Sequence, residues 1–273
     1  MVDQHEKGTR FRALHQAAGV FVIPNAWDGG SARILEGLGF RALATSSSAC
    51  AATLGRVDGK VTRDEALTHA RHIVAATDNP VSADLEKGFG DSPEVVAETV
   101  RLAADVGLVG CSIEDSTGDP NKPIYAFNHA VERIAAAVEA ARGLPFPFTL
   151  AARSENYLAG NPDLDDTLRR LQAFEKAGAD VLFAPALPDL IAVRTVCASL
   201  SRPVNFMVAI KGKSFSVAEL AAAGVRRISL ASSLYRSAMS GLVAAAREVK
   251  DAGTFGYLDS AITSKDLNKF LQG

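Results

Sequence analysis

One sequence pattern recurs along the chain: a helical stretch with one apolar face, then a glycine, then a short apolar run. Four copies are visible, around Leu38-Gly39-Phe40, Val106-Gly107-Leu108, Ala177-Gly178-Ala179 and Ala223-Gly224-Val225. Glycine just past a helix is the expected left-handed cap, and a short apolar run is typical of a parallel strand covered on both faces. The pattern therefore predicts repeated helix-to-strand units.

Other strands have a different lead-in, often a proline, which a strand tolerates at its first position. Between the strands, Thr62 to Glu65 and Ser216 to Glu219 have the spacing of helix capping boxes, and Ser92-Pro93 places a cap before a proline at the first helical position. Eight strands are expected, at residues 20–23, 42–45, 80–83, 111–114, 148–153, 181–184, 203–206 and 228–231.

Eight alternating strand and helix signals without a linker predict one α/β domain over residues 1–273, a single (β/α)8 TIM barrel. An N-terminal helix is expected in 1–18, the barrel in 19–250, and a tail in 251–273 whose short helix packs over the barrel or on a neighbouring subunit. The competitor is a doubly wound open sheet. It is disfavoured because no Gly-rich dinucleotide fingerprint follows the first strand.

Charge and composition narrow the class of protein. The 273 residues have a formal net charge of −2 and no broad basic surface, so neither a nucleic-acid partner nor an anionic membrane is expected. Cys50, Cys111 and Cys197 lack metal or redox spacing, which favours a reducing compartment. No secretion signal or membrane-length apolar run is present, so a cytoplasmic location is expected.

Acidic residues gather where the predicted strands end. Asp84 and Glu86 follow the third strand, Glu114 ends the fourth, and Asp58 lies in the loop after the second. In barrels of this class the reactive groups lie at the carboxyl ends of the strands. Because side chains alternate along a strand, Asp84 and Glu86 are expected to point the same way, about 7 Å apart.

Carboxylates that converge on one opening repel one another unless a cation lies between them. Oxygen ligands without His or Cys favour Mg²⁺ or Mn²⁺. We expect Asp84 as the direct ligand, with Glu86, Glu114 and Asp58 in the water shell. A single acid of this kind is more often a helix cap or a loop residue, and Asp58 has that alternative; the grouping on adjacent strands favours function.

Arg153, at the end of the fifth strand, is the candidate counterpart of these acids. Its guanidinium predicts a fork for a substrate carboxylate, and the alternative is a structural ion pair with Glu155, two residues along. Since Arg153 and Glu155 are two apart, their side chains are expected to share a direction.

Polar residues on other strands extend the candidate site. The hydroxyls and amides of Ser46, Ser47 and Ser48, after the second strand, are suited to holding an anionic group, although a plain polar turn has the same sequence. Asn205, in the seventh strand, is a further substrate-binding candidate.

The positions of the five histidines argue against two kinds of catalytic site. None of them lies at a predicted strand end, so neither a histidine-based triad nor a zinc site is expected.

The acids stand in a pattern that resembles the isocitrate lyase/phosphoenolpyruvate mutase superfamily. The matching segments run in order over about residues 20–238. They are Pro24-Asn25-Ala26-Trp27-Asp28, the loop from Leu54 to Asp58, Ala83-Asp84-Leu85-Glu86-Lys87-Gly88-Phe89-Gly90, Ile113-Glu114-Asp115 and Ala152-Arg153-Ser154-Glu155.

This resemblance implies an oligomeric barrel, a dimer or tetramer formed through an exchanged last helix. It implies magnesium at Asp84, Glu86, Glu114 and Asp58, and a substrate carboxylate or phosphoryl group near Ser46, Ser47 and Arg153. The shared chemistry is stabilisation of a pyruvate-like enolate while a C–C or P–C bond breaks or forms. Arg153, Glu114 and Lys122 are the catalytic candidates that follow.

Departures from the family pattern bear on the reaction. The C–C lyases carry a Cys-Gly-His segment shortly after the Glu-Asp pair, whereas residues 115–123 here contain neither Cys nor His. The phosphonate branch has a Lys-Thr-Asn-Ser gate in that loop, and only Asn121-Lys122 is similar. The position of the mutases' substrate-contacting Trp is Ala44, and the metal pair is Asp-x-Glu rather than Asp-x-Asp.

Three functions remain open. The leading one is a Mg²⁺-dependent lyase that acts on a small 2-oxo or 2-hydroxy carboxylate, with decarboxylation of oxaloacetate as the simplest case and water as the proton donor. The second is a P–C bond enzyme of the phosphonopyruvate hydrolase or phosphoenolpyruvate mutase type, in which Lys122 covers the phosphoryl group. The third is a barrel that binds a metal and a 2-oxo acid without turnover.

Overall fold

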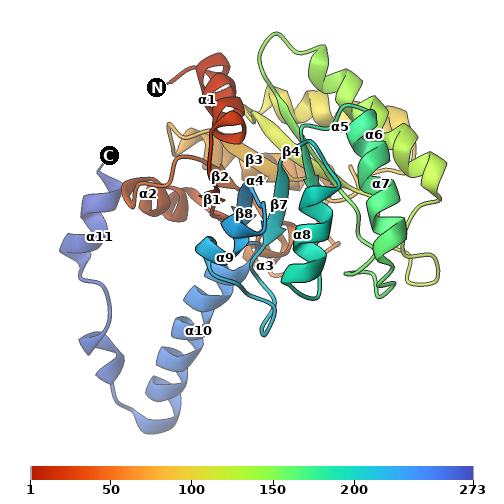
Figure 1. Cartoon of the computed structure of the whole chain (residues 1–273). Helices are drawn as coiled ribbons and strands as arrows, with labels where there is room; N and C mark the ends of the chain where they lie inside the picture. Colours follow the sequence, from red (N-terminus) through yellow and green to blue (C-terminus); the bar gives the residue numbers. More distant parts are fainter. Residues whose placement is uncertain (1, 273) are drawn as a thin grey trace.

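A ring of eight parallel strands, with helices around it, forms the body of the molecule in a computed structural model that describes residues 2–272 (Figure 1). The strands follow one another in sequence order around the sheet, and an isolated parallel bridge between Asn25 and Ala44 links the two ends. The predicted barrel is confirmed, nearly closed. The strands are β1 (Phe21–Ile23), β2 (Leu43–Ala44), β3 (Val81–Asp84), β4 (Gly110–Glu114), β5 (Thr149–Arg153), β6 (Val181–Phe183), β7 (Val204–Met207) and β8 (Arg227–Ser229).

Each strand is followed by at least one helix; two α-helices follow β2, and two follow β8. The helices are α1 (Gln4–Gln16), α2 (Gly29–Gly37), α3 (Ser47–Thr53), α4 (Arg63–Ala75), α5 (Pro93–Asp105), α6 (Phe127–Arg142), α7 (Leu164–Lys176), α8 (Leu190–Ala198), α9 (Val217–Ala222), α10 (Ser233–Arg247) and α11 (Ser264–Leu271), with a π-helical turn η1 (Glu248–Ala252) and a 3-10 turn η2 (Gly256–Asp259).

The helix starts lie where the capping signals predict them. Thr62 and Ser216 each accept a hydrogen bond from the backbone of a glutamate three residues on, whose side chain returns to the cap. Ser92 caps α5 ahead of a proline at its first turn. Local hydrogen bonds of this kind fix where a helix begins.

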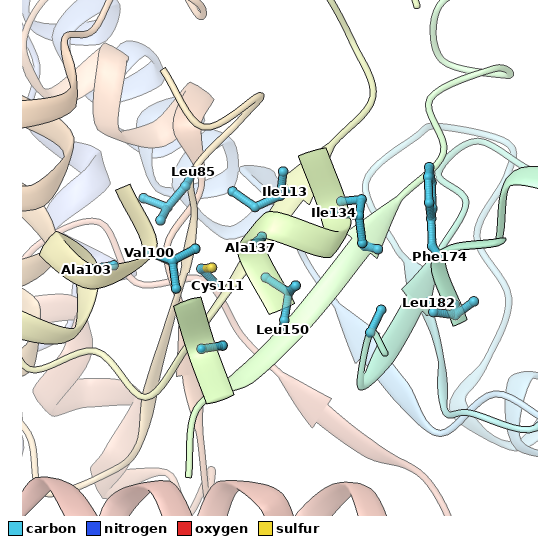
Figure 2. Close-up of a cluster of buried hydrophobic side chains, with 14 of the residues drawn as sticks. Leu85, Val100, Ala103, Cys111, Ile113, Ile134, Ala137, Leu150, Phe174 and Leu182 are labelled. Atoms are coloured by element: carbon cyan, nitrogen blue, oxygen red, sulfur yellow. The ribbon is translucent and has the colours of Figure 1, made fainter. Parts of the chain in front are cut away.

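The main hydrophobic core lies between the strands and the helices that surround them (Figure 2). Strand residues such as Ile113, Leu150 and Leu182 meet Ile134 and Phe174 from the helices. Cys111 belongs to the same core. The strands therefore turn every second side chain outward and leave the others for the lumen.

A second, smaller core closes the amino-terminal end of the barrel. Phe11 of α1 packs there with Phe21, Ile23, Ala42 and Val109. With this end plugged, the open end is the one where the strands finish.

The C-terminal segment leaves the barrel. Figure 1 shows α10 extending away from the strands and the chain returning so that α11 lies beside α2. None of the residues of α10 is buried. The ring of Phe270 in α11 lies against Gly37, so α11 contacts its own chain. Among the helices of residues 2–272, none has both the length and the apolar character that a bilayer crossing requires.

Candidate active site

A cavity of about 260 Å³ opens at the carboxyl ends of the strands. Six of the residues predicted from the sequence line it: Ser46, Ser47, Ser48, Asp58, Asp84 and Arg153. The remaining lining residues are Asn25, Ala44, Thr45, Ser82, Ala83, Ser112, Leu158, Phe183, Met207, Ala209, Arg227, Ser229, Ala231, Ser232 and Arg236. The fold therefore gathers side chains that are up to 211 positions apart in the sequence, from Asn25 to Arg236.

Arg153 is the electrostatic centre of the opening. Its guanidinium contacts Glu155 Oε1 at 2.9 Å, Asp84 Oδ1 at 3.2 Å and Glu114 Oε2 at 3.3 Å, and it lies over the ring of Phe183. Burial opposes the charge, but the three carboxylates outweigh it and raise the pKa of Arg153. The ion pair with Glu155 is thus present, and Arg153 also joins β3, β4 and β5 at their ends.

Asp84 has a mixed set of partners. Besides Arg153, its carboxylate lies 3.3 Å from the backbone amides of Ser47 and Glu86, which donate to it, and 3.5 Å from the hydroxyl of Ser112. Its own backbone amide donates to Thr45 Oγ1. These contacts hold one oxygen-rich group at the end of β3, between the second and fourth strands.

Glu86 faces Asp84, but for a reason other than strand alternation. Strand β3 ends at Asp84, and Glu86 is in the left-handed region with φ of 49°, so strand alternation, the reason for expecting a shared direction, does not apply to this pair. The turn nevertheless brings Glu86 to a small recess that Asp84 also lines. Burial, and then the charges of Asp84 and Asp58, raise the pKa of Glu86 to about 7.

Asp58 reaches the same place from the loop after α3. Its pKa is raised, first by burial and then by the charge of Asp84, while the neighbouring Ser47 side chain opposes the shift. Glu114 and Glu155 also have raised pKa values, with burial as the main cause. Several acids therefore share a region in which Arg153 is the central cation.

Four sequence candidates are not among the residues that line the cavity: Glu86 and Glu114, described above, and Lys122 and Asn205. Lys122 is exposed, on the loop between β4 and α6 that folds back through a bridge between Ser116 and Ile124. Asn205 is buried just beneath the lining, where its amide donates to Ser229 Oγ at 3.0 Å and its carbonyl accepts from Arg227 Nε at 2.8 Å. A catalytic role for Lys122 and substrate contact by Asn205 stay predictions.

A buried network supports the ends of β4 and β5. Asp115 accepts from the backbone amide of Glu155 at 2.8 Å and from Arg170 at 3.1 Å. Arg170 and Asn156 both reach Asp166, at 2.7 and 2.9 Å. This network fixes the loop that carries Glu155 and, through it, the orientation of Arg153.

Sequence reasoning missed the β8 side of the cavity, which holds Arg227, Ser229, Ser232 and Arg236. Arg227 begins its strand rather than ending it, so a search of strand ends does not find it. The available signal was an arginine directly before a predicted apolar parallel strand, where a buried charge is unusual.

The donor chemistry of the opening is suited to a hard divalent cation. Its acids offer oxygen ligands, and the two softer groups nearby do not compete: burial raises the pKa of the Cys50 thiol to about 11, and His69 Nε2 is engaged with the carbonyl of Trp27 at 2.8 Å. Within residues 2–272, no three His, Cys, Asp or Glu side chains converge as a ready-made metal cluster. The arrangement fits an ion with one or two carboxylate ligands and water for the rest.

The family model for phosphoenolpyruvate phosphomutase matches residues 11–250. The chain belongs to the PEP mutase/isocitrate lyase superfamily. The barrel is thus that of an enzyme superfamily, as the residue pattern predicts.

Relatives within the superfamily include carbon–carbon lyases. The chain is 33% identical over 189 residues to a probable 2-methylisocitrate lyase 2 from Corynebacterium glutamicum, a match that covers 67% of this chain but only 60% of that protein. A solved 2,3-dimethylmalate lyase is 28% identical with a TM-score of 0.87, covering 99% of this chain and 95% of that one.

A closer structural likeness is to a protein of Burkholderia cenocepacia J2315 that is provisionally assigned as a lyase or mutase. It is 50% identical to this chain, with a TM-score of 0.97 over 99% of this chain and 98% of that one. Nearly the whole length of this superfamily member, C-terminal segment included, therefore has a counterpart of the same shape.

Proposed function

We propose that this chain is a Mg²⁺-dependent carbon–carbon lyase that acts on a small 2-oxo or 2-hydroxy carboxylate through a pyruvate-like enolate, with decarboxylation of oxaloacetate as the first reaction to test. The observation that carries the proposal is the cluster at the cavity opening. There one arginine is shared by three carboxylates, and the flanking acids Glu86 and Asp58 have raised pKa values.

The acids would hold the ion in two ways, directly and through its bound water molecules. Asp84 would bind it directly, and Glu86, Glu114 and Asp58 would bind its water molecules, since magnesium keeps several waters in most protein sites. A bound divalent ion would supply the positive charge that stabilises an enolate. Mn²⁺ has similar ligand preferences and would serve in its place.

The chain's own residues would bind and orient the substrate. Arg153 is buried and held by Glu155, so its position is set before a ligand arrives. The hydroxyls and amides of Ser46, Ser47 and Ser48 line the cavity beside Asp84 and would hold a substrate carboxylate against it. A group fixed in this way places the bond to be broken in a constant orientation.

Residues 115–123 contain neither Cys nor His, and this determines which lyase we propose. Cleavage that relies on a cysteine acid in that loop is not expected. Decarboxylation leaves an enolate that water can protonate, so it needs no such group.

The test is release of pyruvate from oxaloacetate, above the rate given by Mg²⁺ alone. Activity should need the divalent ion and fall at least about 100-fold in Asp84→Ala, because the direct ligand is lost. Asp105→Ala, at the end of α5 and exposed, is the matched control and should keep native activity. Native turnover in the presence of EDTA would rule the proposal out.

The same assay discriminates the alternatives. Formation of oxalate and acetate, in place of pyruvate and CO₂, would show that the protein cleaves a C–C bond of oxaloacetate by hydrolysis and does not decarboxylate it. Phosphate release from phosphonopyruvate would select P–C bond chemistry, which the match to the phosphoenolpyruvate phosphomutase model favours, with Lys122 above the phosphoryl group. Mg²⁺-dependent binding without any product would indicate the non-catalytic barrel.

We also propose that the chain forms a dimer or tetramer through its C-terminal segment. Support comes from the exposed apolar side chains that cluster there: Leu242, Val243, Val249, Phe255, Leu258 and Ile262. Exposed apolar surface of this extent is unusual in a monomer. Sedimentation would show an oligomer, and deletion of residues 248–273 would reduce it to monomers.

A further inference from the structure

The lumen of the barrel contains a second arginine below the acidic opening. Arg227, at the start of β8, is 5% exposed and lines the same cavity as Asp84 and Arg153. Strand pairing places Arg153, Phe183, Asn205 and Arg227 in one row across β5, β6, β7 and β8. The two arginines therefore belong to one row of residues around the same cavity.

The partners of Arg227 are neutral. Its Nε donates to Asn205 Oδ1 at 2.8 Å, and its Nη1 lies 3.5 Å from His15 Nε2. Because His15 Nδ1 lies 2.8 Å from the carbonyl of Phe11 and must donate to it, Nε2 is left as the acceptor. Within residues 2–272, Arg227 has no carboxylate at salt-bridge distance, whereas Arg153 has three.

A charge in that position needs an explanation. A buried guanidinium without a counter-ion is costly, and proteins normally pair it. Asn205 and His15 hold the side chain in place without neutralising it. Arg227 is thus a positioned cation whose charge is available to pair with an anionic group that enters the cavity.

The cavity has room for such a group. Barrel lumens are usually filled by branched aliphatic side chains, but here the lining beside Arg227 is small: Ala44, Ser82, Ser112 and Ser229. A volume of about 260 Å³ suits a molecule of metabolite size rather than a larger ligand. The opening offers acids and Arg153, and the interior offers Arg227 with hydroxyls around it.

We propose that Arg227 binds the second anionic group of a dianionic substrate, a carboxylate at the end opposite the 2-oxo or 2-hydroxy group. Arg227 is then the residue that selects dicarboxylates over monocarboxylates. The inference rests on the proposed function for the other end of the substrate, which lies at Asp84 and Arg153. A planar guanidinium with free N–H groups matches a carboxylate in shape and charge.

The test compares two ligands that differ only at the far end. Malate and 2-hydroxybutyrate share the 2-hydroxy acid, and one ends in a carboxylate where the other ends in a methyl group. Calorimetry in Mg²⁺ should show native protein binding malate about tenfold or more tighter. In Arg227→Met that ratio should fall below about threefold, and Arg227→Lys should keep part of it, because the charge remains without the fork.

Arg226→Met is the matched control. Arg226 precedes Arg227, is exposed, and donates to the carbonyl of Gly19 at 3.3 Å rather than lining the cavity. It should keep the native ratio. Because the ratio is measured within one protein sample, partial unfolding of a variant changes both affinities alike and leaves it intact.

An unchanged malate preference in Arg227→Met overturns the inference, and so does an unchanged KM for oxaloacetate in that variant. If native protein prefers malate through Arg227 yet converts no 2-oxo acid, the inference stands and the proposed lyase does not. A phosphonate-ended analogue, 3-phosphonolactate, that binds tighter than malate and depends equally on Arg227 would replace carboxylate by phosphonate as the end group and overturn the dicarboxylate assignment.

Discussion

The opening and the interior of the barrel hold the same residue type under opposite electrostatic conditions. At the opening, Arg153 is shared by Asp84, Glu114 and Glu155. In the interior, the hydrogen-bond partners of Arg227 within the described part of the chain are an amide oxygen and a neutral imidazole. Both arginines are nearly inaccessible, at 8% and 5% exposure.

The difference separates a cation that is paired with acids from one that is not. Arg153 compensates acids that would otherwise repel one another, so the charges at the opening are in large part mutually satisfied. Arg227 compensates no acid among residues 2–272. Burial and the charge of Arg153 lower the pKa of Arg227 to about 10, which marks a group whose charge the fold does not stabilise. A ligand with an anionic group at that place would form an ion pair with Arg227.

Stability measurements on matched substitutions would sharpen this contrast most. Without metal or ligand, Arg153→Met should lower the free energy of unfolding by about 3–5 kcal/mol, because three carboxylates lose their buried partner. Arg227→Met should cost less than about 1 kcal/mol or stabilise the protein, since it removes a buried charge without leaving an acid behind. Urea unfolding in EDTA measures both.

The milder variant Arg153→Lys keeps the charge and should give an intermediate loss. Added Mg²⁺ should restore part of the stability of Arg153→Met, because the ion replaces the missing positive charge among the acids. Equal losses in the free energy of unfolding for Arg153→Met and Arg227→Met would show that the two arginines do not differ in how the fold compensates their charge.

The pH dependence of stability tests the neutral imidazole in the interior. Burial, and then the nearby charge of Arg227, lower the pKa of His15 to about 3. Below its unfolded value of about 6.5 the unfolded chain takes up a proton that the folded chain does not, so stability falls as the pH drops from about 6.5 toward 3. At pH 4.5 the loss should be about 2–3 kcal/mol, and His15→Gln should remove that part of the slope.

His5→Gln provides the control, since His5 is in the same helix but exposed. Denaturant midpoints between pH 4 and 8 would reveal the difference. If His15→Gln and native protein lose stability in parallel over that range, His15 is already charged in the fold and the interior is not neutral.

The smallest effect concerns the hydroxyl that completes the interior network. Ser229→Ala removes the acceptor for the amide of Asn205 and should cost about 1 kcal/mol. Ser232→Ala also alters a cavity-lining hydroxyl, but one with no capping bond to α10, and should cost much less. Thermal unfolding compares the two, and equal costs would mean that Asn205 is not held through Ser229.

Much of the fold follows from local rules that need no knowledge of distant residues. The alternation of short apolar runs with capped helices is enough to place all eight strands within a few residues of their observed ends. Glycines at helix ends and capping boxes at helix starts work through neighbours in sequence. The acids of the opening are found in the same way, because a barrel always brings strand ends together.

Several features of the site do not follow from local rules. Glu86 faces Asp84 through a left-handed turn rather than strand alternation, and Lys122 lies on an exposed loop away from the cavity lining. The importance of Arg227 depends on what surrounds it: small side chains from other strands, and a histidine 212 positions away.

The sequence by itself determined the barrel, its superfamily and the acidic residues at the strand ends, because periodicity, caps and motifs are properties of neighbouring residues. Only the tertiary structure decided how the charges are matched. Whether a buried arginine is neutralised depends on distances to residues from other strands, and these exist only once the ring has closed. That is why Arg153 and Arg227, alike in the sequence, differ in what they can bind.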